Sequence, residues 1–371
     1  MAMRMPQSGM SLVEIMVATL IGMIGILIIT NAYITGDNFQ RSTLGESGAQ
    51  MNGLVALYTI ERDARMSGYG INNSGALGCG NIYWYFDPNY SSNIAGGTLP
   101  NITLAPVLIT VGATPNVPDQ ITIMYSRESE RMMPTTINTF HASSSEVSVD
   151  GVDGFTAGDL VLLVGSGGCT LGKITQVQPG PQKLQLNPGN SGPQNPPAWG
   201  SFPTTYNGND SIMNLGDPVV RTYLIGNNGK LRIAESVFST GSSTPIDMVD
   251  GVVDLRAQYG KDNGVNNGTI TQAVYAANDS VVDSYDNVTP ATGAAWLQVQ
   301  SIRIGVLARV GNYEKPSVTG GNCDATTVAP AWSGGTFSAV DIATVTSQDR
   351  CYRYRVFETT IPLRNMIWRA S

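Results

Sequence analysis

The sequence predicts an α+β protein in which one long N-terminal transmembrane helix precedes a globular head of antiparallel β-sheets with long loops. Three observations support this fold class. Residues 10–34 form an apolar run with one charge and no proline. Helical periodicity continues beyond this run to about residue 66. Past residue 100 apolar residues mostly alternate with polar ones, as expected for half-buried strands.

The composition narrows the classes of protein that this chain could represent. Of its 371 residues only 13% are charged, the net charge is −7, and His141 is the one histidine. A nucleic-acid binder that relies on clustered Lys and Arg is therefore excluded, and so is a coiled coil. A single histidine also leaves little for a histidine metal site or for histidine-dependent catalysis. We expect no enzyme, no catalytic residue, no metal and no cofactor.

The apolar run at residues 10–34 is long enough to cross a membrane. As a helix it would span about 37 Å, compared with a hydrocarbon layer of about 30 Å. A cleaved signal peptide would have a shorter apolar core, of roughly 7–15 residues, and a better cleavage site than Thr30-Asn31-Ala32. An ordinary anchor leaves Glu14 unexplained, because a carboxylate inside the bilayer costs up to about 3.5 kcal/mol.

Cleavage between Gly9 and Met10 would explain Glu14. The new α-amino group of Met10 would be charged near neutral pH. Glu14 of one subunit would then pair with this ammonium group of an adjacent subunit inside an apolar bundle. There a paired charge is tolerated and fixes the register, whereas an unpaired charge is strongly unfavourable. Glu14 is therefore predicted to be a subunit-docking residue.

The segment Gly9-Met10-Ser11-Leu12-Val13-Glu14 resembles the class III signal of type IV prepilins, in which a glycine, a hydrophobic residue, three further residues and a glutamate precede an apolar helix. The resemblance implies cleavage by prepilin peptidase after Gly9 and N-methylation of Met10. It divides the chain into a leader peptide at residues 1–9, a pilin helix at residues 10–67 and a β-rich head at residues 68–371. Residues 10–34 are the transmembrane and assembly half of the helix.

After the membrane segment, helical character continues over residues 37–66. One helical face carries the apolar residues Leu44, Met51, Val55 and Tyr58. We expect this face to pack under the globular head, because amphipathic stripes usually belong to a core. A bend or local melting is expected near the glycines at 36, 45, 48 and 53, since glycine weakens a helix by up to about 1 kcal/mol relative to alanine. Gly68 and Gly70 are predicted to end the helix.

Three further segments resemble the PilW-type minor pilins of type IV pili. Residues 60–70, IERDARMSGYG, are similar to the signature that follows the long helix in that family. Residues 250–260 are similar to a late strand of the family, and residues 356–365 to its C-terminal strand. The resemblance is weakest over residues 80–150 and 190–215, which we interpret as family-variable loops.

The head is predicted to be built from strands. The candidates are residues 106–111, 120–126, 146–150, 159–165, 173–177, 183–187, 219–225, 230–235, 250–259, 296–310 and 352–363. The segment Gly226-Asn227-Asn228-Gly229 separates two of them and carries Asn-Gly, a strong signal for a hairpin turn.

Four cysteines are present, at positions 79, 169, 323 and 351. An even number in an exported protein predicts two disulfides, for which three connectivities are possible. We favour Cys323–Cys351, which would close a segment rich in Gly, Thr and Ala, and Cys79–Cys169, which would join the loop after the helix to the end of a strand. Each is expected to contribute roughly 3–4 kcal/mol.

Three other motifs were weighed as ligand or catalytic sites. Residues 167–173 approach a phosphate-binding loop, but Ile174 replaces the hydroxyl residue and a strand pattern follows, so a hairpin turn is expected. His141 lies in a serine-rich segment without a nucleophile elbow and is interpreted as a surface histidine. Calcium near Asp262 remains a minor hypothesis, because the loop is rich in Asp and Asn but lacks the spacing of a calcium-binding loop.

The resemblances imply a minor pilin that helps to initiate pilus assembly at the tip and supports adhesion and twitching motility. The implied partners are other minor pilins, the major pilin, a tip adhesin, the prepilin peptidase and the inner-membrane assembly platform. The implied location is the inner membrane, with one span and a periplasmic head, and then the pilus tip at the cell surface. The alternatives are a J-type pseudopilin of a type II secretion system and a membrane-anchored extracytoplasmic binding protein.

Overall fold

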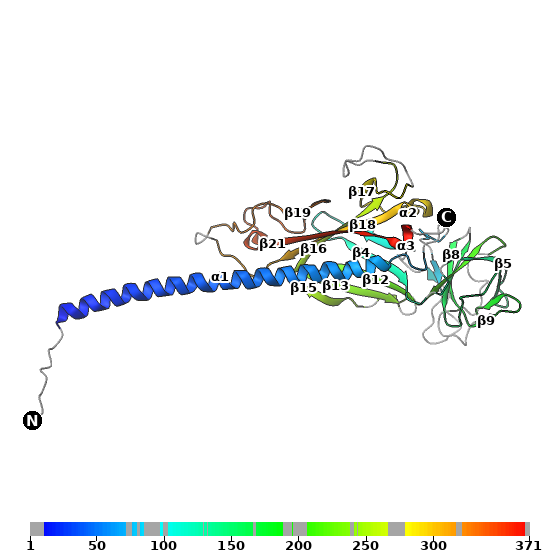
Figure 1. Ribbon diagram of the computed structural model, residues 1–371, viewed down its shortest axis with the longest axis horizontal. Coiled ribbons are helices and arrows are strands. Elements are labelled where there is room, and N and C mark those ends of the chain that lie inside the picture. The colour runs from blue at the N-terminus through cyan, green and yellow to red at the C-terminus, as the bar shows by residue number, and fades with distance from the viewer. Residues whose placement is uncertain are drawn as a thin grey trace, which may run out of the picture.

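The structure, a computed structural model, describes residues 11–71, 76–79, 82–84, 97–98, 103–128, 130–131, 133–165, 168–187, 195, 206–237, 241–242, 244–265, 279–316 and 321–367. A long helix, α1 (Leu12–Met66), precedes a β-rich head (Figure 1). The N-terminal half of α1 projects away from the head, and its C-terminal half lies along the sheets. The predicted fold class is confirmed.

Helix α1 is continuous over 55 residues. The local melting expected between residues 36 and 53 does not occur, and from Gly45 onward the helix is in contact with the head. The segment Leu12–Asp37 is long and apolar enough to cross a membrane. The helix ends where predicted: Gly68 adopts a φ of 77°, a left-handed conformation that favours glycine.

Two antiparallel sheets form the central part of the head. The six-stranded sheet has the order β14-β13-β12-β4-β3, and β15 also pairs with β13. The four-stranded sheet has the order β17-β16-β18-β21. The bounds of these strands are β3 (Val107–Thr110), β4 (Gln120–Ser126), β12 (Pro218–Gly226), β13 (Lys230–Val237), β14 (Gly241–Ser242), β15 (Ile246–Asp250), β16 (Val252–Lys261), β17 (Ser284–Asp286), β18 (Val299–Arg309) and β21 (Tyr354–Pro362).

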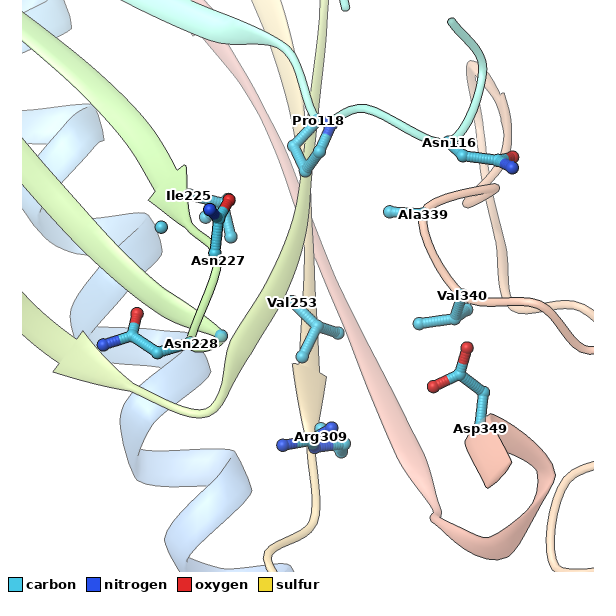
Figure 2. Close-up of a pocket in the computed structure, with 12 residues that line it drawn as sticks. Asn116, Pro118, Ile225, Asn227, Asn228, Val253, Arg309, Ala339, Val340 and Asp349 are labelled. Carbon is cyan, nitrogen blue, oxygen red and sulfur yellow. The ribbon is translucent and has the colours of Figure 1, made fainter. Parts of the chain in front are cut away.

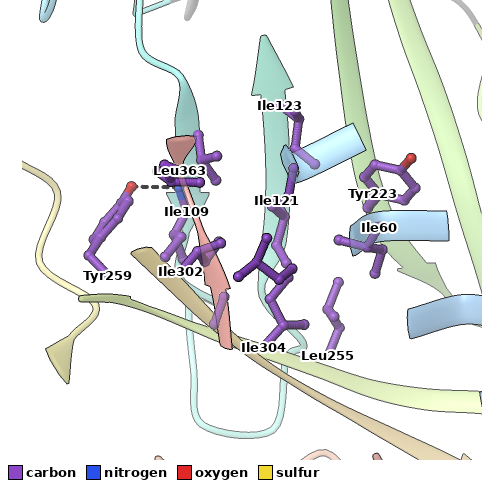
Figure 3. Packing of buried hydrophobic residues seen from close by; sticks show 14 of the residues in the cluster. Ile60, Ile109, Ile121, Ile123, Tyr223, Leu255, Tyr259, Ile302, Ile304 and Leu363 are labelled. Atoms are coloured by element: carbon purple, nitrogen blue, oxygen red, sulfur yellow. Dashed lines mark hydrogen bonds between the residues drawn. The ribbon is translucent and has the colours of Figure 1, made fainter. Parts of the chain in front are cut away.

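The main core lies where α1 meets these two sheets. Ile60 of α1 is fully buried against residues of both sheets (Figure 3). The six-stranded sheet contributes Ile121 and Tyr223, and the four-stranded sheet contributes Leu255 and Ile304. The short helices α2 (Gly293–Leu297) and α3 (Arg364–Ile367) close this core at its end. The C-terminal half of α1 is therefore an integral layer of the head.

A nine-stranded sheet forms the part of the head farthest from the projecting end of α1 (Figure 1). Most of it is an insertion between β4 and β12, which pair directly at Ser126 and Pro218. All neighbours are antiparallel except β1 and β8. In spatial order the strands are β2 (Gly97–Thr98), β1 (Ile82–Trp84), β8 (Gly168–Lys173), β7 (Leu160–Gly165), β11 (Ser211–Gly216), β5 (Thr135–His141), β6 (Glu146–Val149), β10 (Lys183–Gln185) and β9 (Gln176–Gln178).

Most predicted strands are present, and four predictions need correction. The strand predicted over residues 296–310 begins only at Val299, because Trp296 and Leu297 belong to helix α2. Residues 173–177 are not one strand, because β8 ends at Lys173 and β9 begins at Gln176. Residues 250–259 contain a break at Gly251, whose φ of 75° turns the chain from β15 in one sheet to β16 in the other. The segments read as family-variable loops contain strands that were missed, namely β1, β2, β5 and β11.

Two disulfides cross-link segments of the head. Cys79, which follows α1, is joined to Cys169 of β8, with 6.5 Å between their Cα atoms. Cys323 is joined to Cys351 at the end of a short 3-10 helix (Gln348–Cys351), with a Cα separation of 4.9 Å. The hairpin of β19 (Ala331–Trp332) and β20 (Gly335–Thr336) lies within the segment that this second bridge closes. These are the two pairings that the sequence favoured.

Candidate assembly surface

The membrane segment of α1 presents apolar side chains on every side. The large hydrophobic side chains from Leu12 to Ile34 are all at least half exposed. This is expected for a helix that is surrounded by lipid or by other helices. Glu14 lies in the first turn, where a carboxylate interacts favourably with the positive end of the helix dipole. No cation among the described residues forms an ion pair with Glu14. Gly9 and Met10, the predicted cleavage site, lie outside the described residues.

The face of α1 that packs on the head is formed mostly by small residues. Its members, other than Asp63, are Ala49, Gly53, Ala56, Ile60 and Ala64. At Gly53 an added Cβ would lie 2.1 Å from a ring carbon of Phe357, a residue of β21. At Gly53 the helix therefore lies so close to the sheet that no side chain would fit.

The face with the larger apolar residues points the other way, so the prediction that it packs under the head is wrong. At 100° per residue these side chains project from the side of α1 opposite to Ala56. They remain 43–66% exposed: Leu44, Met51, Leu54, Val55 and Tyr58. Together they form the outer stripe, which continues the apolar surface of the membrane segment along the outside of the head.

A buried carboxylate fixes α1 to the six-stranded sheet. Asp63, 1% exposed, accepts hydrogen bonds from Tyr223 Oη at 2.7 Å and from Arg221 Nη1 at 3.0 Å. Burial and the bond to Asp63 raise the pKa of Tyr223 well above its usual value, so its phenol remains a donor. Burial alone would lower the pKa of Arg221, but its bonds to Asp63 and Glu235 outweigh that effect and raise it. This role was not predicted from the sequence, although Asp63 lies three residues after Ile60 and therefore on the same side of the helix.

The C-terminal segment also holds α1. Asn365 Nδ2 donates to the main-chain oxygens of Met66 and Ser67, at 3.2 and 3.0 Å. These contacts satisfy carbonyl groups that the end of a helix leaves unpaired. Farther along α1, Glu46 forms an ion pair with Arg355 of β21.

The three segments on which the family resemblance rests meet in one place. Residues 60–70 end α1, residues 250–260 contain most of β16, and residues 356–365 contain most of β21. All three contribute to the main core, for example through Ile60, Leu255 and Ile361. The likeness therefore concerns the layer that positions α1 against the head.

The remaining candidate motifs take part in turns and strand ends. His141 is exposed at the end of β5. Asp262 is buried and accepts a hydrogen bond from the main chain of Ser280 at 2.7 Å, while Asp283 accepts one from Gly264 at 2.6 Å. Within the described ranges, no three His, Cys, Asp or Glu side chains are grouped as metal ligands would be. The prediction that residues 167–173 form a hairpin turn is wrong for most of the segment, because residues 168–173 form strand β8.

Two family models support the two resemblances. Residues 222–365 match the family model of the type IV pilus-assembly protein W, and residues 4–30 match the prokaryotic N-terminal methylation motif. A solved type IV-like pilin from Thermus thermophilus shares 10% identity with a TM-score of 0.32, over 85% of this chain and 97% of that one. No curated protein matches the chain. The resemblance to PilW and to prepilins is confirmed over these two regions.

Proposed function

We propose that this chain is a minor pilin. In this proposal prepilin peptidase cleaves it between Gly9 and Met10, and Met10 is N-methylated. The chain then spans the inner membrane once with its head in the periplasm. It joins other minor pilins and the major pilin on the assembly platform and helps to initiate the pilus at its tip, where it supports a tip adhesin, adhesion and twitching motility.

The observation that carries this proposal is the outer stripe. A membrane anchor needs about 20 apolar residues, and the segment Leu12–Asp37 already supplies them. The outer stripe begins beyond that segment, at Leu44, and runs to Tyr58 without being covered by the head. An anchored binding protein does not require exposed Leu and Met side chains at this position. A subunit that packs its helix against other helices requires them for the contact.

The prediction is tested by photo-crosslinking in the host. Tyr58, 66% exposed on the outer stripe, is replaced by p-benzoylphenylalanine, and the same residue replaces Met133, 60% exposed on the inserted part of the head, as a matched control. Irradiation is expected to link position 58, and not position 133, to another pilin subunit of the pilus. An absence of protein adducts at position 58, with the chain present at normal levels, would contradict the proposal. Adducts with secretion pseudopilins would assign the chain to that system instead.

A further inference from the structure

The head contains a polar cleft that the proposed function does not use. Its volume is about 460 Å³, within the usual range for small-molecule sites. Three separate parts of the chain surround it: the β12–β13 turn, the residues before β4 and the segment that follows β20. Val253 and Arg309 lie between these walls (Figure 2).

Arg309 is the cation of this cleft. It is the last residue of β18, and its guanidinium lies 4.5 Å from the centre of the Tyr352 ring. Stacking on an aromatic face leaves the N–H donors at the edge of the guanidinium available. No carboxylate among the described residues forms an ion pair with Arg309. The neighbouring Lys230, by contrast, is paired with Asp247 and Asp250.

The other lining residues bring neutral hydrogen-bonding groups, an apolar surface and one carboxylate, that of Asp349, which lies on the wall with Val340 and accepts a hydrogen bond from the main-chain N–H of Asp341 at 2.8 Å. Asn227 and Asn228 lie on one side and Asn116 lies above the opposite side (Figure 2). Each carboxamide can both donate and accept, as a ligand hydroxyl requires. Val253 and Val340 offer apolar contacts between these polar groups.

We propose that this cleft binds a hexuronic acid, with its carboxylate on Arg309 and its hydroxyls on the asparagines. Arg309 can bind a carboxylate through two parallel hydrogen bonds, and the carboxylate of Asp349 on the other wall can accept a hydrogen bond from a ligand hydroxyl. The asparagines suit a ligand with several hydroxyls, and the valines suit the C–H face of a sugar ring. An extended peptide is disfavoured because β12, β13 and β18 are paired on both sides, so none offers an edge to a further strand.

The test measures binding to the full-length chain in detergent micelles by ligand-observed NMR. The probes are galacturonate, galactose, inorganic phosphate and the dipeptide glycyl-aspartate. Galacturonate is expected to bind with a dissociation constant on the order of 1 mM, and at least about tenfold more tightly than the other three. Arg309→Gln should weaken its binding about tenfold or more, because a charge-assisted hydrogen-bond pair is lost.

Two further variants keep the test decisive. Asn227→Ala removes a ligand group from the turn and should weaken galacturonate several-fold, whereas Arg364→Gln removes an exposed arginine of α3, outside the cleft, and should leave binding unchanged. Unchanged unfolding midpoints in all variants establish that the head is intact. Equal binding of galactose, phosphate or the dipeptide would overturn the proposal. So would an absence of galacturonate binding, or full binding by Arg309→Gln.

Discussion

Replacement of Glu14 by valine is expected to abolish assembly while leaving the chain in the membrane. The change removes a charge from an apolar helix, so insertion should be as efficient as before or better. Cleavage depends on Gly9 and should continue. In the assembled state, however, the ammonium group of a neighbouring Met10 would enter the bundle without its carboxylate, at a cost of roughly 3–5 kcal/mol. Glu14 is about 50 residues from the head core at Ala64, so the fold of the head should not change.

The experiment compares Glu14→Val with Thr19→Val in the native host. Thr19 is exposed on the same segment, and its hydroxyl bonds only to the main-chain oxygen of Met16. Membrane level, cleavage, co-purification with other minor pilins and surface piliation are measured. Only Glu14→Val should lose co-purification and piliation. Normal piliation in that variant would mean that Glu14 is not a docking residue, and loss of membrane insertion would mean that it acts before docking.

Replacement of Asp63 by alanine is expected to lower the free energy of unfolding of the head by about 3–5 kcal/mol. The change leaves Arg221, which is 22% exposed, and the buried Tyr223 phenol without their shared acceptor. It also releases α1 from the six-stranded sheet. Chemical unfolding followed by the fluorescence of the tryptophans, which include the fully buried Trp296, provides the measurement.

Glu61→Ala is the matched control for this variant. Glu61 is two residues away on the same helix, and its partner is Arg65, four residues on, at the surface. Such a pair contributes only about 0.2–0.5 kcal/mol. A loss of stability in Asp63→Ala no larger than in Glu61→Ala would show that the Asp63 contacts do not hold the helix to the head.

The sequence predicted the long helix, its end at Gly68 and most of the strands, because these depend on local patterns. It could not predict which face of α1 meets the head. Periodicity groups Leu44, Met51 and Tyr58 on one face, but it does not tell whether that face meets a sheet or another protein. The observed orientation of α1 depends on Gly53, which allows the helix to approach Phe357 closely. These two residues are far apart in the sequence and meet only in the folded chain.

The missed strand β11 has a comparable explanation. In β11 the side chain of Asn214 is buried, which breaks the expected alternation of polar and apolar residues. Its amide donates to Gly154 O and to Asp159, both at 2.8 Å. These partners lie more than 50 residues away, so the pattern that would identify the strand exists only after folding. The cleft at Arg309 could not be predicted from the sequence either, since its walls come from three distant parts of the chain.

The proposal that this chain is a processed pilin subunit is tested most directly by the mass and N-terminal sequence of the protein from its host. The account predicts a chain that begins at Met10 and carries one methyl group on its new amino terminus. A stable, functional chain that begins at Met1, or one that is cut after residue 30, would contradict it.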